Sequence, residues 1–160
     1  MNKHAVLQLI LEKLSVDLDI AQRAAQTAYE TATDEENIAE NKYDTLGLEA
    51  SYLAAGQAKR VEEIKQSLTL CQNLQLRAYD DQRGIEVGAL VGLEDENGRQ
   101  QWLFLAPDAA GLKVEVVGQP VTVITPRSPM GNSLLGKFEG DEVEILVAGT
   151  RQHFTVTEAK

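Results

Sequence analysis

The sequence predicts an α+β fold in which an N-terminal helical hairpin precedes a small β-rich domain. Two observations support this division of the chain. Apolar residues follow a heptad repeat in the first half and fall in short strand-like runs after about residue 79. Before Gly84 the chain has only two glycines, Gly47 and Gly56, and no proline, whereas both residue types recur afterwards. We therefore predict a hairpin over residues 1–78 and a second domain over residues 79–160.

The first predicted helix extends from Ala5 to Thr33. Its apolar residues alternate in steps of four and three, which is the spacing of a coiled-coil seam. The seam residues are Leu7, Leu11, Leu14, Leu18, Ala21, Ala25, Ala28 and Ala32. At about 1.5 Å per residue this helix is roughly 40 Å long. We interpret such length in a small protein as a way to extend one end of the hairpin to a distant site.

The same spacing returns from about Leu46 to Ala78. The second seam consists of Ala50, Ala54, Gln57, Val61, Ile64, Leu68 and Cys71, of which only Gln57 is polar. In both helices the small seam residues lie toward the intervening turn and the large ones lie toward the free end. These gradients match only if the helices are antiparallel, as in a hairpin with a short connection. Cys71, at a seam position, is predicted to be buried and unreactive.

After residue 79 the sequence predicts a mostly antiparallel β domain. The expected strands are Glu86–Leu93, Gln101–Leu105, Val114–Val117, Val121–Ile124, Val143–Val147 and His153–Thr157. The run DENG at 95–98 predicts a hairpin between the first two strands. A short helix is expected within MGNSLLGK at 130–137.

Composition restricts the function classes. With 25 acidic and 15 basic residues the net charge is −10, which argues against direct DNA binding because phosphate contact needs a basic patch. Glu12 and Lys13 interrupt the N-terminal apolar stretch, so neither a signal peptide nor a membrane span is expected. A single cysteine excludes an internal disulfide. We expect a cytoplasmic protein without a membrane partner.

The acidic residues concentrate at the predicted turn of the hairpin, near 34–45. Residues 30–49 contain seven acids and one base, a net charge of −6, whereas the rest of 1–78 has a net charge of +2. Two interpretations stay open on charge alone. The acids could solvate a turn, or a long arm could deliver them to a positive or metal-bearing site. Mg²⁺ suits the second interpretation, because it prefers oxygen ligands and takes few carboxylates from a protein.

The run SPMGNSLLGKFEGDEVEI at 128–145 resembles the signature of the bacterial Gre transcript-cleavage factors. The family pattern is S-P-x-x-x-x-L-[IL]-G-K-x-x-G-D-x-V. The matching positions are Ser128, Pro129, Leu134, Leu135, Gly136, Lys137, Gly140, Asp141 and Val143. The order of a helical hairpin, an acidic tip near residue 40 and a β domain of the FKBP type also agrees with this GreA/GreB-like family.

The resemblance implies a transcription elongation factor whose partner is RNA polymerase. Gre factors insert the hairpin through the secondary channel of the polymerase, while the globular domain docks on the rim of the channel. Two acidic tip residues help to hold a Mg²⁺ ion shared with the polymerase, which then cleaves the 3′ end of backtracked RNA by two-metal chemistry. The protein is therefore expected not to be an enzyme by itself, and to meet nascent RNA only through the polymerase.

The family tip reads approximately G-D-x-x-E-N-A-x-Y, and this chain matches it in part. Glu40 and Asn41 align with the Glu-Asn pair, so Glu40 is the predicted metal ligand. Asn37 stands where the family has aspartate, and it offers a neutral oxygen in place of a charge. The neighbouring acids that could compensate are Asp34, Glu35, Glu36 and Asp44.

The motif at 128–137 is interpreted as a structural turn and core segment that also contributes to polymerase docking. The docking residues expected there are Ser128, Pro129, Met130, Leu134 and Leu135. Two alternatives to a cleavage factor remain, and Asn37 is the reason for the first of them. One is a non-cleaving regulator that occupies the same channel, and the other is a coiled-coil adaptor for an unrelated partner.

Overall fold

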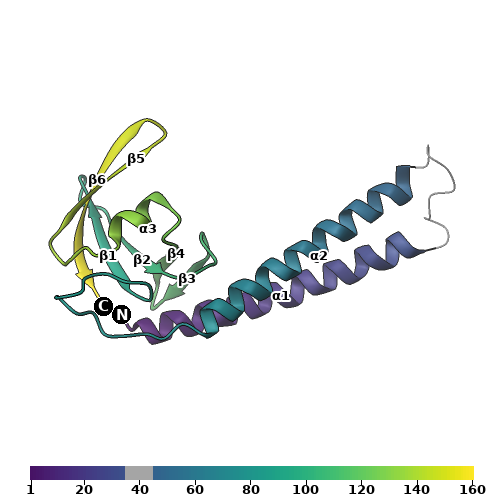
Figure 1. The fold of residues 1–160 in the computed structure, drawn as a ribbon, viewed down its shortest axis with the longest axis horizontal. Coiled ribbons are helices and arrows are strands. Elements are labelled where there is room, and N and C mark those ends of the chain that lie inside the picture. Colours follow the sequence, from purple (N-terminus) through teal and green to yellow (C-terminus); the bar gives the residue numbers. More distant parts are fainter. Residues whose placement is uncertain (35–44) are drawn as a thin grey trace. The chain divides into compact units, whose positions relative to one another are not determined.

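A computed structural model describes residues 1–34 and 45–160 (Figure 1). In chain order, two long helices precede a six-stranded sheet with one short helix. The helices are α1 (Lys3–Thr33), α2 (Thr45–Gln72) and α3 (Pro129–Leu134). The strands are β1 (Leu90–Asp95), β2 (Gln100–Leu105), β3 (Lys113–Val116), β4 (Gln119–Ile124), β5 (Glu142–Val147) and β6 (Thr150–Ala159). The predicted α+β class, with a helical pair before a β-rich domain, is confirmed.

The chain forms two compact units. One contains Lys13–Leu68, and the other contains Met1–Glu12 together with Thr69–Lys160. The first turns of α1 and the end of α2 are thus grouped with the sheet, whereas the sequence placed all of 1–78 in the hairpin. In these first turns of α1, the side chains of Val6 and Ile10 are fully buried. The heptad pattern had selected their neighbours Leu7 and Leu11, which are half-buried.

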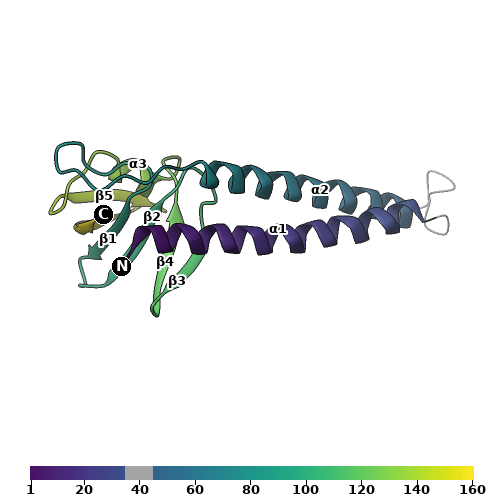
Figure 2. The ribbon, with the colours of Figure 1, turned by 90° about the horizontal axis from the view of Figure 1, so that it is seen from below.

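Within Lys13–Leu68, α1 and α2 are antiparallel and lie side by side (Figures 1 and 2). Both predicted seams are on the inside of this pair. Leu14, Ala21, Ala28, Val61 and Ile64 are buried. The remaining seam positions in this unit are buried or half-buried, including the polar Gln57. Within Lys13–Leu68 the heptad spacing therefore identified the contact faces of both helices correctly.

The second helix ends six residues earlier than the expected Ala78. The amide of Leu74 bonds to the carbonyl of Cys71 in a turn after Gln72, and the chain then leaves the helix. Leu76 lies beside Gly88, where a β-carbon would come within 3.3 Å of the Leu76 side chain. Packing of this segment against the sheet unit therefore replaces the last helical turns.

The strand order is β3-β4-β2-β1-β6-β5, and only the pairing of β2 with β4 is parallel among the described strands. β1 begins at Leu90, later than the expected Glu86, because Gly88 has a positive φ of 101° and Ala89 bonds back to Glu86. The expected DENG hairpin is present. Its Asp95 carboxylate accepts hydrogen bonds from the amides of Asn97 and Arg99, at 2.8 and 2.9 Å.

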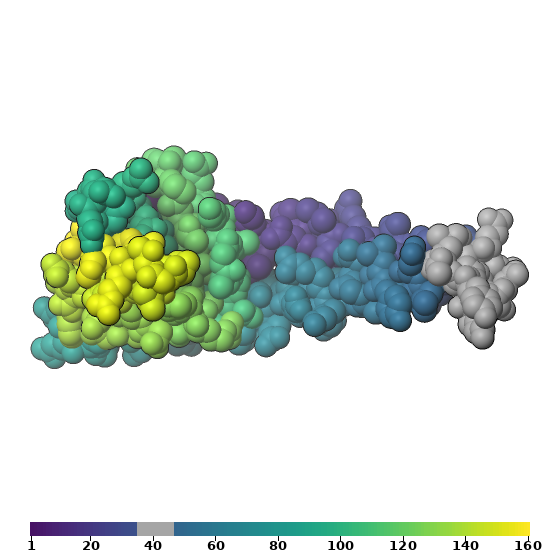
Figure 3. Space-filling model, turned by 90° about the horizontal axis from the view of Figure 1, so that it is seen from above, coloured from purple at the N-terminus to yellow at the C-terminus, as the bar shows by residue number. Residues whose placement is uncertain are grey.

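Both faces of the central strands are buried. One face and α3 form a core that includes Leu93, Leu103, Leu134, Phe154 and Val156. Side chains on the opposite face of these strands are also fully buried, namely Leu90, Phe104, Val121 and Val123. The start of β6, next to the turn from β5, differs because Arg151, Gln152 and His153 are exposed. Figure 3 shows the C-terminal part of the chain, in yellow, on the surface of the molecule.

Candidate functional site

The end of the helical hairpin is the first part of the candidate site. α1 ends at Thr33, whose hydroxyl donates to the carbonyl of Tyr29 at 2.9 Å, and α2 begins at Thr45. Of the predicted tip residues, Asp34 is described by the structure and is exposed. The others lie outside the described residues, and these are Glu35, Glu36, Asn37, Glu40, Asn41 and Asp44. Their assignment stays a prediction.

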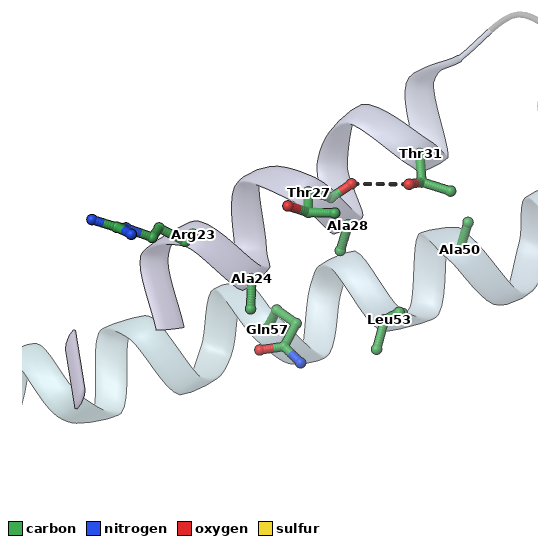
Figure 4. A pocket seen from close by; sticks show the side chains of 8 residues that line it. All are labelled: Arg23, Ala24, Thr27, Ala28, Thr31, Ala50, Leu53 and Gln57. Atoms are coloured by element: carbon green, nitrogen blue, oxygen red, sulfur yellow. Dashed lines mark hydrogen bonds between the residues drawn. The ribbon is translucent and has the colours of Figure 1, made fainter. Parts of the chain in front are cut away.

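The helices near this end meet through small side chains. A groove of 390 Å³ between them is lined on one side by Ala24, Ala28 and Thr31, and on the other by Ala50 and Gln57 (Figure 4). A second groove of 460 Å³, lined in part by Ala25, Ala54 and Ala58, also lies between the two helices. The alanine-rich seam thus leaves open space between the helices on both of these surfaces.

Large apolar side chains are exposed on the same part of α2. Leu48 and Tyr52, one helical turn apart, are exposed, as is Leu53. On α1, Tyr29 is exposed near the same end. Our sequence interpretation did not identify this surface, although the spacing of Leu48 and Tyr52 outside the heptad seam was a visible signal. Exposed apolar residues at helical spacing are a common feature of protein-binding surfaces.

The family motif begins at the N-terminus of α3. Ser128 is the N-cap, and its hydroxyl accepts a hydrogen bond from the Gly131 amide at 3.0 Å. The same hydroxyl donates to the carbonyl of the buried Thr125 at 2.9 Å. Pro129 follows at the first helical position, where a proline costs no hydrogen bond. Ser128 and Pro129 therefore have a structural role in starting this helix.

The rest of α3 combines core and surface positions. A β-carbon at Gly131 would lie 1.9 Å from the Thr125 carbonyl oxygen, so a side chain is excluded there. Leu134 is fully buried and Met130 packs against the core, whereas Leu135 is 38% exposed. The exposed members of the predicted docking set are thus Pro129 and Leu135, with Ser128 and Met130 half-buried. The docking role itself stays a prediction.

The second half of the motif also has clear structural contacts. Gly136 has a φ of 77°, and its amide bonds to the carbonyl of Ile85. The Asp141 carboxylate accepts from the Phe138 amide at 2.9 Å, and the Gly140 amide bonds to Val156. The positive φ of Gly136, and that of Gly140 at 90°, favour glycine at these positions, and the bond from the Phe138 amide accounts for aspartate at 141.

Within 1–34 and 45–160 no three His, Cys, Asp or Glu side chains are arranged to hold a metal ion. None of the helices in the same ranges is both long and apolar enough to cross a membrane.

Comparison with known proteins gives two curated relatives. Transcription elongation factor GreA of Jannaschia sp. strain CCS1 is 27% identical over 97 residues, which are 61% of this chain and 58% of that protein. GreA of Alkalilimnicola ehrlichii is 28% identical over 103 residues, 63% of this chain and 61% of that protein. The chain thus aligns with about three fifths of the length of these relatives. No family model matches the sequence.

Solved structures that align with this chain include Gfh1 of Thermus aquaticus, with a TM-score of 0.41 and 23% identity over 92% of both chains. GreA factor homolog 1 of Thermus thermophilus has a TM-score of 0.39 and 21% identity over 94% of both chains. A GreA/GreB factor of Nitrosomonas europaea has a TM-score of 0.38 and 18% identity, covering 64% of this chain and 91% of its own. Together with the motif at 128–145, the curated relatives confirm the predicted resemblance of this chain to the Gre family of transcription elongation factors.

Proposed function

We propose that this protein is a transcription elongation factor that binds RNA polymerase and inserts the end of its helical hairpin into the secondary channel. The observation that carries this proposal is the combination of two helices, of 31 and 28 residues, with a strongly acidic connection between them. The Gre-like motif in α3 and the GreA relatives support the same partner. The protein would meet nascent RNA only through the polymerase and would make no direct contact with DNA or a membrane.

In this proposal the chain is not an enzyme by itself but stimulates cleavage of backtracked RNA in the polymerase active centre. Glu40 would be a ligand of a Mg²⁺ ion that is shared with the polymerase, since carboxylate oxygens are preferred ligands of this ion. Such an ion lowers the pKa of a bound water and neutralises charge on the reacting phosphate. Asp34, Glu35, Glu36, Asn41 and Asp44 would supply negative charge or position the ligand.

Asn37 favours a second candidate function. An amide oxygen carries no formal charge, so it attracts a divalent cation less strongly than a carboxylate does at the same position. A factor with Asn37 could occupy the channel without stimulating cleavage, and would then regulate initiation or pausing. The two functions share the partner and differ in the chemistry at the tip.

A transcript-cleavage assay distinguishes them. A backtracked bacterial elongation complex with a labelled RNA is incubated with the full chain and Mg²⁺, and release of 3′ fragments is measured beside polymerase binding. For a cleavage factor, Glu40→Ala should reduce the rate at least tenfold with unchanged binding, because a metal ligand is lost. Glu63→Ala, which removes an exposed acid from α2 far from the turn in sequence, is the matched control and should retain the rate.

The other outcomes of this assay decide between the alternative functions. Binding without fragment release supports the non-cleaving regulator, and Asn37→Asp should then introduce cleavage by restoring a charged ligand. Absence of polymerase binding by the folded protein contradicts both functions and leaves an adaptor for another partner.

A further inference from the structure

The open end of the helical hairpin contains an unusual buried charge. Lys3, in the first turn of α1, is 8% exposed, and no other charged side chain is buried in the part of the chain that the structure describes. Its Nζ donates a hydrogen bond to the backbone carbonyl of Arg77. Burial lowers the pKa of Lys3, and the negative charge of Glu86 opposes this effect. A buried ammonium group is costly unless it keeps such a partner.

The acceptor of this bond is held in place. Arg77 lies five residues after the end of α2, and its guanidinium pairs with Glu86 at 3.0 Å. Glu86 also faces Arg83, at 3.8 Å. Next to it, the Ile85 amide bonds to the carbonyl of Lys137 at 2.8 Å, which fixes this segment to the sheet unit. The Lys3–Arg77 contact therefore connects the start of α1 to a fixed point just beyond the end of α2.

The part of the seam toward the turn specifies the axial alignment of the helices only weakly. Toward the turn the seam consists of small residues such as Ala21, Ala28 and Ala50, and grooves of 390 and 460 Å³ remain between the helices. In a coiled coil, large side chains that pack into holes on the facing helix normally fix the register. Alanine side chains are too small to do this effectively. Buried polar groups are a well-attested means of specifying register at some cost in stability.

We propose that Lys3 is a register lock for the hairpin, a positioning residue that fixes the axial alignment of α1 with α2 through the Arg77 carbonyl. Sliding α1 by one helical turn, about 5.4 Å, would move Nζ out of hydrogen-bonding range and leave a buried ammonium group unpaired. Only one register is compatible with the bond. The proposal concerns the chain alone and holds whether or not it binds a polymerase.

The test uses electron spin resonance distances in the full chain. In a Cys71→Ala background, spin labels are attached at Gln22→Cys on α1 and Glu49→Cys on α2. Both positions are exposed, and Glu49 lies more than three helical turns along α2 from Glu62, which lines the same groove as Gln22, so sliding along the helix axis changes the label separation. With Lys3 intact one narrow distance distribution is expected. Lys3→Met, which keeps the length and removes the charge, should add a population shifted by about 5 Å.

Two variants complete the test. Lys59→Met removes an exposed lysine from α2 and should leave the single distribution unchanged. Lys3→Arg retains a cationic donor, so it should also show the single narrow distance distribution. An unchanged single distribution in Lys3→Met overturns the proposal, as does an equal broadening in Lys59→Met. If circular dichroism shows that Lys3→Met does not fold, Lys3→Gln is measured in its place with the same two outcomes.

Discussion

Val117 is the residue whose conformation fits its side chain least well. It forms the two-residue turn between β3 and β4 with Gly118, and has a φ of 50° while 98% of its surface is exposed. A turn of this kind requires positive φ at both central residues and favours Asn-Gly. A β-branched residue in that conformation is strained, so the turn is formed despite Val117 and because of the pairing of Val116 with Gln119.

Replacing this valine tests the strain directly. Val117→Asn should raise the free energy of unfolding by about 1 kcal/mol, because asparagine tolerates positive φ at lower cost. Urea denaturation followed by circular dichroism measures the change. Glu115→Asn, at an exposed β3 position outside the turn, is the control and should give no comparable gain. Equal stability of Val117→Asn and the parent chain would contradict the assignment of strain.

Cys71 shows what burial does to a thiol. The side chain is fully buried, as its seam position predicted, and burial raises its pKa from 9.0 to about 11. At pH 8 this shift reduces the thiolate population ~100-fold. Alkylation of the folded protein by iodoacetamide should therefore be at least that much slower than alkylation in urea, as measured by mass spectrometry. Comparable rates in the two conditions would exclude a protected thiol.

The same shift predicts a pH dependence of stability. Between pH 9 and about 11 the unfolded chain releases the Cys71 proton while the folded protein retains it. The free energy of unfolding should therefore fall as pH rises through this window. Cys71→Ala removes this contribution, so its stability should decline less steeply over the same range. Identical slopes for the two proteins would argue against the raised pKa.

At the scale of elements, α3 combines a structural motif with a small exposed surface. The hydrogen bonds of Ser128, the close approach at Gly131 and the burial of Leu134 all serve the fold. A sequence motif can thus indicate a family through its structural requirements alone. Leu135, 38% exposed at the end of this helix, is a position where docking can be tested with little effect on the core.

Leu135→Glu tests the predicted docking surface. If this end of α3 contacts RNA polymerase, a charge should raise the Kd at least tenfold through loss of apolar contact and cost of desolvation. Fluorescence anisotropy with labelled protein measures the Kd. Leu146→Glu, at an exposed leucine on β5, is the matched control and should bind normally. Equal Kd values for both variants and the parent chain would place docking elsewhere.

At the scale of the whole molecule, the sequence determined the features that depend on local periodicity and turn chemistry. The seam from Leu14 to Ala28, the DENG hairpin and the short helix after Ser128 are all in the structure. Heptad spacing and turn residues act between near neighbours, so they are readable without knowledge of the fold. The Gre resemblance rested on nine residues of one motif and is supported by the GreA relatives.

The tertiary structure decided what depends on contacts between distant residues. The end of α2 at Gln72 follows from packing of Leu76 beside Gly88, and the parallel pairing of β2 with β4 has no local signal. The burial of Lys3 could not be predicted, because a lysine near the chain start normally reaches water and its acceptor lies 74 residues away. Only the folded chain brings an ammonium group and that carbonyl together, since the connection depends on the paths of both long helices.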